Sequence, residues 1–531
     1  MSTANLRRFI VLGFIAAGIV ACSGGSGHIS SSSSGDDYSG APSGDPLPED
    51  LPNSQAFIGL APDHRHFQFR DGTPFVPVGH NDWTDLRLFL DTDRLEPYLS
   101  FMKQNGENVL RLVLDSYGLN ADSRYQNRVE TRVGEFNPDL VAALDNLTRA
   151  AERHGVYLLI AVWCVYENVN WPRHPYNVRY DAEKGLVENP DDLLEDPRAI
   201  EAAKNRMRFF IERWGSSPSI FAWELWNEFN VMGTTEQRNR WLQEIGSFAR
   251  KLETDLYGQH HLRTASANNA GWGSGEEGIF NSPELDFTSY HTYDTFGLVG
   301  IRPYSGIPQA SPLDPILYLR FIRESARVAG DKSAARPILG TEDVGIVTDP
   351  GSVFPPFDQP FRSYTGEQLV DFFIGTEWAG WMGGGAGPSL RWPCTPAYGE
   401  GDAQGYRALS LEMYDAQKAL RRIAATLDWR TFAPEPADEA VGTRDSDRFL
   451  CMALRDGGTV LGWVLNTDPA FSRQEVRTQV AFRSLAARPY RIEWFDMRTG
   501  DALQVDFAQG PELTLSTPPF RTFVAFKAQS G

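Results

Sequence analysis

The chain has 531 residues, of which 41% are hydrophobic, so it is long enough for one large and one small domain. Acidic residues outnumber basic residues by 69 to 50, which leaves a formal net charge of -19. This charge repels nucleic acids and anionic membrane surfaces, and we expect neither as a binding partner.

The N-terminus has the features of a targeting segment. Arg7 and Arg8 precede an apolar run over 9–20 that is too short to span a bilayer comfortably, which predicts a signal peptide. The run ends in residues 19–22, Ile-Val-Ala-Cys, which resembles the lipobox of bacterial lipoproteins. The resemblance implies that Cys22 is acylated and becomes the mature N-terminus. The alternative is an ordinary secretory signal that contains a cysteine.

Residues 23–52 consist mainly of Ser, Gly, Asp and Pro. A segment with so few apolar residues cannot bury a core, and we expect a disordered, flexible tether. A tether behind an acyl group predicts a protein of the bacterial cell envelope, either lipid-anchored, with the outer membrane favoured, or secreted. Membrane contact is then expected through the N-terminal lipid only.

From about 53 to 427, short β-branched or aromatic runs alternate with longer amphipathic stretches. The predicted strands are 75–79, 108–114, 156–164, 220–226, 261–266, 286–290, 337–341 and 380–383. The predicted helices are 93–104, 138–154 with a C-cap at Gly155, 197–214, one that begins near Gly366, and 404–426. Eight such units predict a (β/α)₈ barrel, an α/β fold in which catalytic side chains lie at the C-terminal ends of the strands.

The fourth predicted strand leads into residues 221–228, Phe-Ala-Trp-Glu-Leu-Trp-Asn-Glu. This run resembles clan A of the glycoside hydrolases, particularly the family 5 cellulases and β-mannanases, whose fourth strand ends in an Asn-Glu pair. The resemblance implies that Glu228 is the general acid/base and that Asn227 binds the sugar 2-hydroxyl. A partly buried glutamate beside aromatic residues has a raised pKa, which suits a proton donor. Glu224 is expected to be a structural partner inside the barrel.

The seventh predicted strand runs into residues 338–343, Ile-Leu-Gly-Thr-Glu-Asp. This run resembles the nucleophile motif of the same clan, which implies that Glu342 is the nucleophile. Asp343 is the alternative, but neighbouring residues of a strand point to opposite faces, so only one of the two faces the barrel axis. A retaining mechanism requires two carboxyl groups about 5 to 5.5 Å apart.

Three further residues match the clan in strand order. Arg111, at the end of the second strand, resembles the arginine that keeps the nucleophile ionised by pairing with it. His291 and Tyr293 form a His-x-Tyr pattern after the sixth strand, and the resemblance implies that the tyrosine donates a hydrogen bond to the nucleophile.

Contacts with the sugar are expected from the first and the eighth predicted strands. Trp381, on the eighth strand, resembles the aromatic platform beneath the sugar at the cleavage point, where a ring covers the apolar face of a pyranose. His80 and Asn81, after the first strand, are candidates for contacts with sugar hydroxyls. The third strand departs from many family 5 enzymes, because it ends in Trp163-Cys164 where they carry a histidine.

Beyond residue 428 the pattern changes to short alternating strands, such as 449–454, 459–466 and 490–496, with Gly457-Gly458 as a hairpin turn. We expect a small β-sandwich over 428–531, similar to those attached to many barrel glycosidases. Packing against the barrel is the favoured role, and sugar binding is the alternative.

The cysteines carry no metal or redox signature. Cys164, Cys394 and Cys451 show no C-x-x-C spacing, at least one of them must be unpaired, and we interpret all three as structural.

These observations predict a retaining glycoside hydrolase that acts on β-linked oligo- or polysaccharide, with β-mannan or β-glucan favoured. It is expected to require no metal and no cofactor. Two alternatives stay open: a non-catalytic glycan-binding surface lipoprotein, and a retaining transglycosylase. The sequence does not identify the sugar, distinguish internal from terminal attack, or give the oligomeric state.

Overall fold

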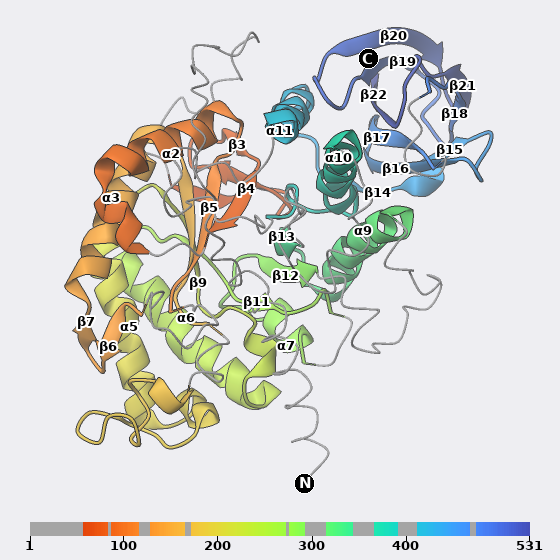
Figure 1. Ribbon diagram of the computed structural model, residues 1–531. Coiled ribbons are helices and arrows are strands. Elements are labelled where there is room, and N and C mark those ends of the chain that lie inside the picture. The colour runs from red at the N-terminus through yellow and green to blue at the C-terminus, as the bar shows by residue number, and fades with distance from the viewer. Residues whose placement is uncertain are drawn as a thin grey trace.

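The computed structural model describes residues 57–82, 86–115, 128–164, 171–271, 275–292, 315–343, 366–390, 411–467 and 474–531. Within these residues an N-terminal region of parallel strands and helices is followed by a C-terminal region of antiparallel sheets (Figure 1). The predicted signal peptide and tether, with Cys22, lie outside the described residues, as do Tyr293 and Cys394. Among the described helices, none has the length and apolar composition needed to cross a membrane.

Parallel strands fill the first seven places of the predicted order. Each pairs with the next along the chain. They are β4 (Gly79–Asp82), β5 (Val109–Val113), β8 (Tyr157–Ala161), β9 (Ile220–Glu224), β10 (Leu262–Thr264) with β11 (Ser266–Ala267), β12 (Thr288–Thr292) and β13 (Ile338–Asp343). The second to seventh predicted strands are therefore confirmed. Their buried residues are mostly apolar, as expected for strands covered on both faces.

The first predicted strand was placed too early. Phe75 belongs instead to a small antiparallel sheet of β1 (Ile58–Leu60), β2 (Phe67–Phe69) and β3 (Pro74–Phe75). The parallel strand begins only at Gly79, where the backbone passes so close to Val109 that a Cβ atom would lie 1.8 Å from its carbonyl oxygen. Glycine is therefore required there.

The prediction of an eighth strand at 380–383 is wrong. These residues end helix α10 (Gly366–Met382), and Gly384 then adopts a left-handed conformation with φ +98°. Helix α10 is buried along most of its described length, so its apolar residues show no stripe of helical period. A short apolar run followed by glycines looks the same in a strand, which explains the error.

A segment just after these glycines occupies the eighth place. The amide of Ala386 donates to Ile338 O at 2.9 Å and that of Leu390 to Gly340 O at 2.8 Å, so residues 386–390 lie against β13. On the other side, Asn81 of β4 donates from Nδ2 to Leu390 O at 3.3 Å. The segment thus joins the last parallel strand to the first.

The helices begin and end at residues with the expected capping chemistry. Asn137 accepts from Asp139 N at the start of α3 (Pro138–His154), and Gly155, with φ +64°, ends it as predicted. The remaining helices are α2 (Thr92–Gln104), α5 (Pro197–Trp214), α6 (Thr235–Tyr257), α7 (Glu277–Phe280), α9 (Pro315–Lys332) and α11 (Leu411–Ala424). Short elements between them are η1 (Leu86–Leu90), β6 (Glu130–Arg132), β7 (Glu135–Phe136), η2 (Trp171–Arg173), η3 (Pro190–Leu194) and η4 (Phe229–Val231).

The C-terminal region contains two antiparallel sheets that share an apolar core. The larger is ordered β14-β16-β17-β22-β19-β20 and the smaller β15-β18-β21. Their bounds, with η5, are β14 (Glu435–Pro436), η5 (Asp438–Ala440), β15 (Val441–Thr443), β16 (Phe449–Asp456), β17 (Thr459–Asn466), β18 (Gln479–Phe482), β19 (Pro489–Phe495), β20 (Ala502–Gln509), β21 (Leu513–Ser516) and β22 (Phe523–Ser530). The predicted hairpin turn at Gly457-Gly458 joins β16 to β17.

The other face of the larger sheet packs on helices of the N-terminal region. Figure 1 shows α9, α10 and α11 on the side of the parallel strands that faces β14 to β22. Asp371 of α10 accepts hydrogen bonds from Arg498 and, at 2.7 Å, from Thr522 Oγ1. Trp463 and Phe495 of the sheet belong to the same apolar cluster as Trp378 of α10. The C-terminal region therefore covers helices, the role favoured by its sequence.

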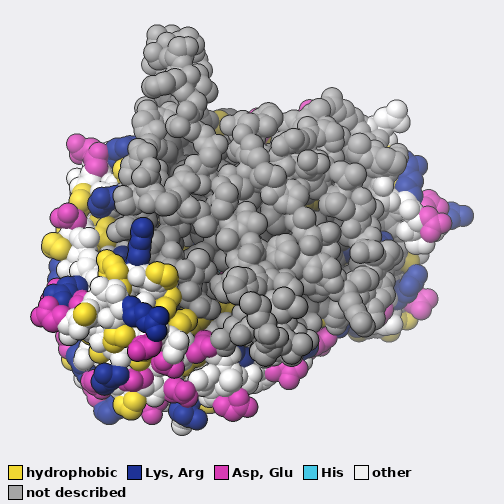
Figure 2. All heavy atoms as spheres, turned by 60° about the horizontal axis from the view of Figure 1, so that its bottom comes forward, with side chains coloured by type: hydrophobic (Ala, Val, Ile, Leu, Met, Phe, Trp, Pro, Cys, Tyr) yellow, Lys and Arg dark blue, Asp and Glu magenta, His cyan; other side chains and the backbone are white. Residues whose placement is uncertain are grey.

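Charged side chains of both signs are interspersed over the described surface at the rim of the face in Figure 2. Several form exposed ion pairs, such as Lys204 with Glu244 at 2.6 Å. Exposed pairs of this kind contribute little to stability but favour solubility.

Trp381 provides a test of the finding that residues near 380 end helix α10 and do not form a strand. Its ring is fully buried and stacks on Trp429 with centroids 5.6 Å apart. We expect Trp381→Ala to lower the free energy of unfolding by about 3–5 kcal/mol because it opens a large cavity. Denaturant unfolding measures this change, and Tyr180→Ala, at a side chain 55% exposed, is the control that should leave the midpoint unchanged. A small effect of Trp381→Ala would contradict the buried position.

Candidate active site

Arg111 is the centre of a buried polar cluster at the C-terminal ends of four parallel strands. It extends from β5, is fully buried, and uses all five of its N–H groups. Nε and Nη2 donate to the two carboxylate oxygens of Glu224 at 2.7 and 2.9 Å. Nη1 donates to Glu342 Oε1 and to Asn81 Oδ1, both at 2.7 Å, and Nη2 donates also to Asn227 Oδ1 at 2.7 Å.

The charges around Arg111 fix its ionisation state. Burial alone would lower the pKa of the guanidinium, but the carboxylates of Glu224 and Glu342 outweigh this effect and raise that pKa above its usual value. Arg111 therefore stays cationic, and its charge faces Glu342 directly. Only a planar guanidinium has the donor geometry for these contacts, so lysine is no substitute.

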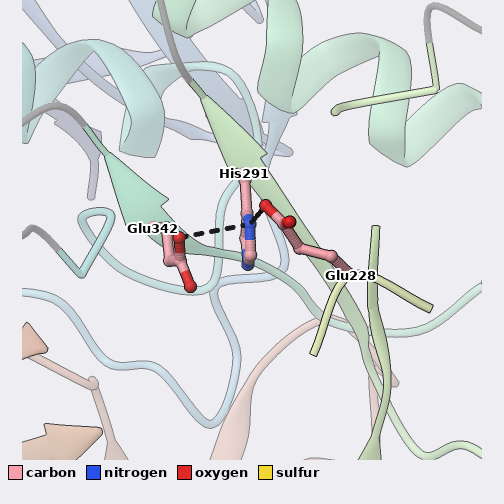
Figure 3. A group of neighbouring side chains, drawn as sticks. All are labelled: Glu228, His291 and Glu342. Carbon is pink, nitrogen blue, oxygen red and sulfur yellow. Dashed lines mark hydrogen bonds and ion pairs between the residues drawn. The ribbon is translucent and has the colours of Figure 1, made fainter. Parts of the chain in front are cut away.

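Two glutamates converge on one histidine beside this cluster. His291 Nδ1 lies 2.8 Å from Glu228 Oε1 and 3.3 Å from Glu342 Oε2, so its ring stands between the two carboxyl groups (Figure 3). One oxygen of Glu228 and one of Glu342 lie within 4.8 Å of each other. This separation fits a retaining pair, whose carboxyl groups are about 5 to 5.5 Å apart, better than an inverting pair at roughly 6.5 to 9.5 Å.

Local backbone irregularities aim these side chains at one another. The register of β12 and β13 shifts after Tyr290, so that His291 pairs with Glu342. Glu228, just past β9, adopts the left-handed conformation with φ +57°, which is uncommon for a residue other than glycine. Bulges and strained residues of this kind cluster at active sites, where they redirect side chains.

The environment of Glu228 favours its protonated form. Burial raises the pKa of this carboxyl above its usual value, and the negative charge of Glu342 acts in the same direction. Hydrogen bonding and charge from His291 lower the pKa, as does the charge of Arg111, but they do not overcome the burial. Glu228 is thus suited to hold a proton, while Glu342 lies against a permanent cation.

The same three side chains also have the spacing of a metal site. Glu228, His291 and Glu342 each offer a ligand atom within 4.8 Å of the others. However, the guanidinium of Arg111 lies 2.7 Å from Glu342 Oε1, and its positive charge opposes a second cation at this carboxylate. The hydrogen-bonded arrangement explains these residues without a metal.

The structure brings most of the predicted site residues together. Arg111, Asn227 and His291 all contact Glu228, Glu342 or each other through the bonds described above. Glu224, expected inside the barrel, is fully buried and pairs with Arg111. The prediction for Tyr293 lies outside the described residues.

Two predicted sugar contacts are wrong. Trp381 lies within α10 and packs on Trp429 rather than ending a strand, so it is no platform for a sugar. His80 points to the face of β4 opposite to Asn81, where its Nδ1 lies 3.0 Å from both carboxylate oxygens of Glu107 and its Nε2 2.9 Å from Tyr98 Oη. Strand alternation separates neighbouring residues in this way, which the prediction for His80 ignored.

Asn81 also has a different role from the predicted contact with a sugar hydroxyl. It is fully buried, accepts from Arg111, and donates from Nδ2 to Thr341 O at 2.9 Å and to Leu390 O at 3.3 Å. Its polar groups thus connect β4 with β13 and with residues 386–390, and they do not face a sugar hydroxyl.

One residue of the site escaped the sequence analysis. Ser266, at the start of β11, accepts a hydrogen bond from Glu228 N at 2.8 Å and donates one to Asn227 Oδ1 at 3.2 Å. Its place at the end of the fifth predicted strand was the one available signal. Serine is too common at strand ends for this signal to be specific.

Comparisons with known proteins find mannan endo-1,4-beta-mannosidases among the sequence relatives. No family model matches the chain. Mannan endo-1,4-beta-mannosidase 2 of Arabidopsis thaliana is 27% identical over 259 residues, which cover 43% of this chain and 59% of that protein. Mannan endo-1,4-beta-mannosidase 2 of Oryza sativa subsp. japonica is 24% identical over 353 residues, 61% of this chain and 74% of that protein. The chain therefore matches about three fifths of the length of the Arabidopsis relative.

Solved structures define the fold more broadly. A glycoside hydrolase family 5 protein from Bacteroides vulgatus ATCC 8482 superposes with a TM-score of 0.58 at 14% identity, over 90% of this chain and 95% of that one. The fold is that of this glycoside hydrolase. Another structure described as a glycoside hydrolase gives a TM-score of 0.58 at 15% identity, over 91% of this chain and 98% of its own. Both matches extend over the N-terminal and the C-terminal regions.

Proposed function

We propose that this protein is a retaining glycoside hydrolase that cleaves β-linked glycans, with β-mannan favoured, through a glycosyl-enzyme intermediate. The observation that carries this proposal is the facing pair of Glu228 and Glu342, one with a raised pKa and the other against Arg111. Mannan is favoured over glucan because the relatives named above are mannan endo-1,4-beta-mannosidases.

The proposed reaction uses each carboxyl group in two steps. The carboxylate of Glu342 attacks the anomeric carbon, and the bond from this carbon to the leaving oxygen breaks as Glu228 gives that oxygen its proton. A water molecule then attacks the anomeric carbon of the intermediate and releases Glu342, while Glu228 takes the proton of the water. Two inversions at the same carbon give net retention.

Neighbouring residues are proposed to stabilise the charges of this reaction. The positive charge of Arg111 is proposed to keep Glu342 ionised before attack. The same charge stabilises the carboxylate of Glu342 when it leaves the anomeric carbon in the second step. Asn227 is proposed to hydrogen-bond the sugar 2-hydroxyl, the role implied by its place before Glu228. Tyr293 remains our candidate donor to the nucleophile, on its His-x-Tyr spacing alone.

We further propose that the N-terminal region, 53–427, is a closed (β/α)₈ barrel and that 428–531 is a β-sandwich. Closure is supported by residues 386–390, which bond to β13 and to Asn81 of β4. The sandwich is supported by the shared core of the two C-terminal sheets. In a closed barrel the C-terminal strand ends meet around one axis, which is where Glu228 and Glu342 lie.

Substitution of the two glutamates tests the mechanism. We expect Glu228→Gln to lower kcat on mannan oligosaccharides by about 10²- to 10⁴-fold, because the leaving sugar needs a proton. An aryl glycoside with an acidic leaving group should lose far less. Glu342→Ala should abolish turnover of both substrates, and azide should rescue it on the aryl glycoside. Glu277→Gln, at an exposed glutamate, is the matched control with wild-type rates.

Product analysis separates the alternatives. NMR of the first products should show the β anomer, and an α anomer would refute the retaining mechanism. A glycan-binding lipoprotein would bind oligosaccharide without any turnover in the wild type. A transglycosylase would instead form longer products as its main products in the presence of excess acceptor sugar.

The pH profile tests the assignment of the proton donor. Activity should fall as the pH rises through the pKa of Glu228, because only the protonated carboxyl can serve the leaving oxygen. His291 lowers that pKa, so His291→Phe should raise it further and move the basic limb of kcat/KM to higher pH. A basic limb that stays in place or moves to lower pH would show that Glu228 does not set it.

We also propose that Cys22 carries a lipid that anchors the protein in the bacterial cell envelope. The support is the lipobox-like sequence followed by a polar tether. Cys22→Ser should release the protein from the membrane fraction of the source cells without loss of specific activity. Unchanged membrane association of the variant, by fractionation and immunoblot, would refute the anchor.

A further inference from the structure

The side-chain amide of Asn227 is held on three sides by protein groups. Its oxygen accepts from Arg111 Nη2 at 2.7 Å and from Ser266 Oγ at 3.2 Å. Its nitrogen donates to Cys164 Sγ at 3.4 Å, within range for a bond to sulfur. Backbone pairing brings these groups together, because Asn227 N donates to Trp163 O at 2.8 Å and Cys164 forms a parallel bridge with Asn227.

The orientation of this amide follows from the chemistry of its partners. Arg111 has only donors, so the atom of Asn227 that faces it must be the oxygen. Ser266 Oγ accepts a hydrogen bond from the backbone N–H of Glu228 at 2.8 Å. Its hydroxyl proton is therefore available for donation to Asn227 Oδ1. The nitrogen must then lie on the side of Cys164.

Within the described part of the chain, the second N–H of this nitrogen has no protein acceptor. An amide nitrogen carries two donors, and among the described residues Nδ2 of Asn227 has Cys164 Sγ as its one partner. If the amide turned over, an oxygen would face the cleavage site and a nitrogen would face Arg111. The first change would remove the donor to a sugar hydroxyl, and the second would place the amide donors of Asn227 against the donors of Arg111.

Ser266 also supports the acid/base residue itself. Glu228 has left-handed backbone geometry and is buried, so its N–H needs an acceptor inside the protein. The hydroxyl of Ser266 is that acceptor. One serine therefore couples the backbone of Glu228 to the side chain of Asn227.

The geometry points to Ser266 and Cys164 as positioning residues that orient the amide of Asn227 toward the substrate 2-hydroxyl. Neither residue touches the reacting atoms, and each acts through Asn227 or Glu228. Cys164 does so at the strand end where many family 5 enzymes carry a histidine. This inference rests on the proposed function for its kinetic consequence, whereas the amide orientation is a structural property of the chain.

Substrate modification isolates the effect of Cys164. Two 4-nitrophenyl β-mannobiosides are compared, one intact and one without the 2-hydroxyl on the sugar at the cleavage point. Cys164→Ala should lower kcat/KM on the intact substrate by about tenfold, since a misdirected donor loses one hydrogen bond, and by less than about twofold on the deoxy substrate. Cys164→Ser, which restores an acceptor, should stay within about threefold of the wild type on both.

Two further variants sharpen the comparison. Ser266→Ala should lower kcat/KM on both substrates, and more on the intact one, because it also removes the acceptor of Glu228 N–H. Cys451→Ala, at the other thiol in the described residues, is the matched control and should change neither rate. Equal losses on the two substrates in Cys164→Ala, or no loss on either, would overturn the inference.

A crystal structure of Cys164→Ala keeps the inference separate from the proposed function. Arg111 and Ser266 should keep the oxygen of Asn227 in place, whereas its nitrogen should move from the wild-type position or occupy several positions once the sulfur is absent. A nitrogen that keeps its wild-type position would overturn the role of Cys164 even if no glycan substrate were found. A wild-type enzyme inactive on both mannobiosides, with a displaced amide nitrogen in the variant, would instead refute the proposed function alone.

Discussion

The five-donor contact of Arg111 is the constraint on which the site depends. A buried guanidinium is tolerated only when every N–H has an acceptor and its charge is balanced. Here the acceptors come from β4, β9 and β13 and from the residue just past β9, so the cation ties together strands that are far apart in sequence. Removal of any one acceptor would leave a donor unsatisfied. The site is therefore rigid for electrostatic reasons as well as through packing.

This rigidity explains how two nearby carboxyl groups differ in character. Both Glu228 and Glu342 are buried, and His291 lies between them. Burial raises the pKa of Glu228, and the more distant charge of Arg111 does not overcome this effect. Glu342, in contrast, is paired directly with the guanidinium at 2.7 Å.

Sequence reasoning succeeded where local patterns carry long-range information. Alternating strand and helix patterns located six of the seven parallel strands, and the Asn-Glu and Thr-Glu strand ends located Glu228 and Glu342. It failed for α10, because a buried helix lacks amphipathic periodicity, and for His80, because the facing of one residue depends on where a short strand begins. Ser266 carries no specific local signal beyond its place at a strand end, since its role arises from a contact across strands.

The end of the third strand shows how one departure from a family pattern is accommodated. A thiol is a weak acceptor, so Cys164 alone cannot hold an amide in place. Arg111 and Ser266 hold the oxygen of Asn227 from the other side, and the sulfur needs only to accept the remaining donor. Because the two stronger contacts fix one end of the amide, the third position tolerates a side chain of weaker hydrogen-bonding power. The contacts that hold the oxygen of Asn227 therefore do not involve the side chain at the end of the third strand.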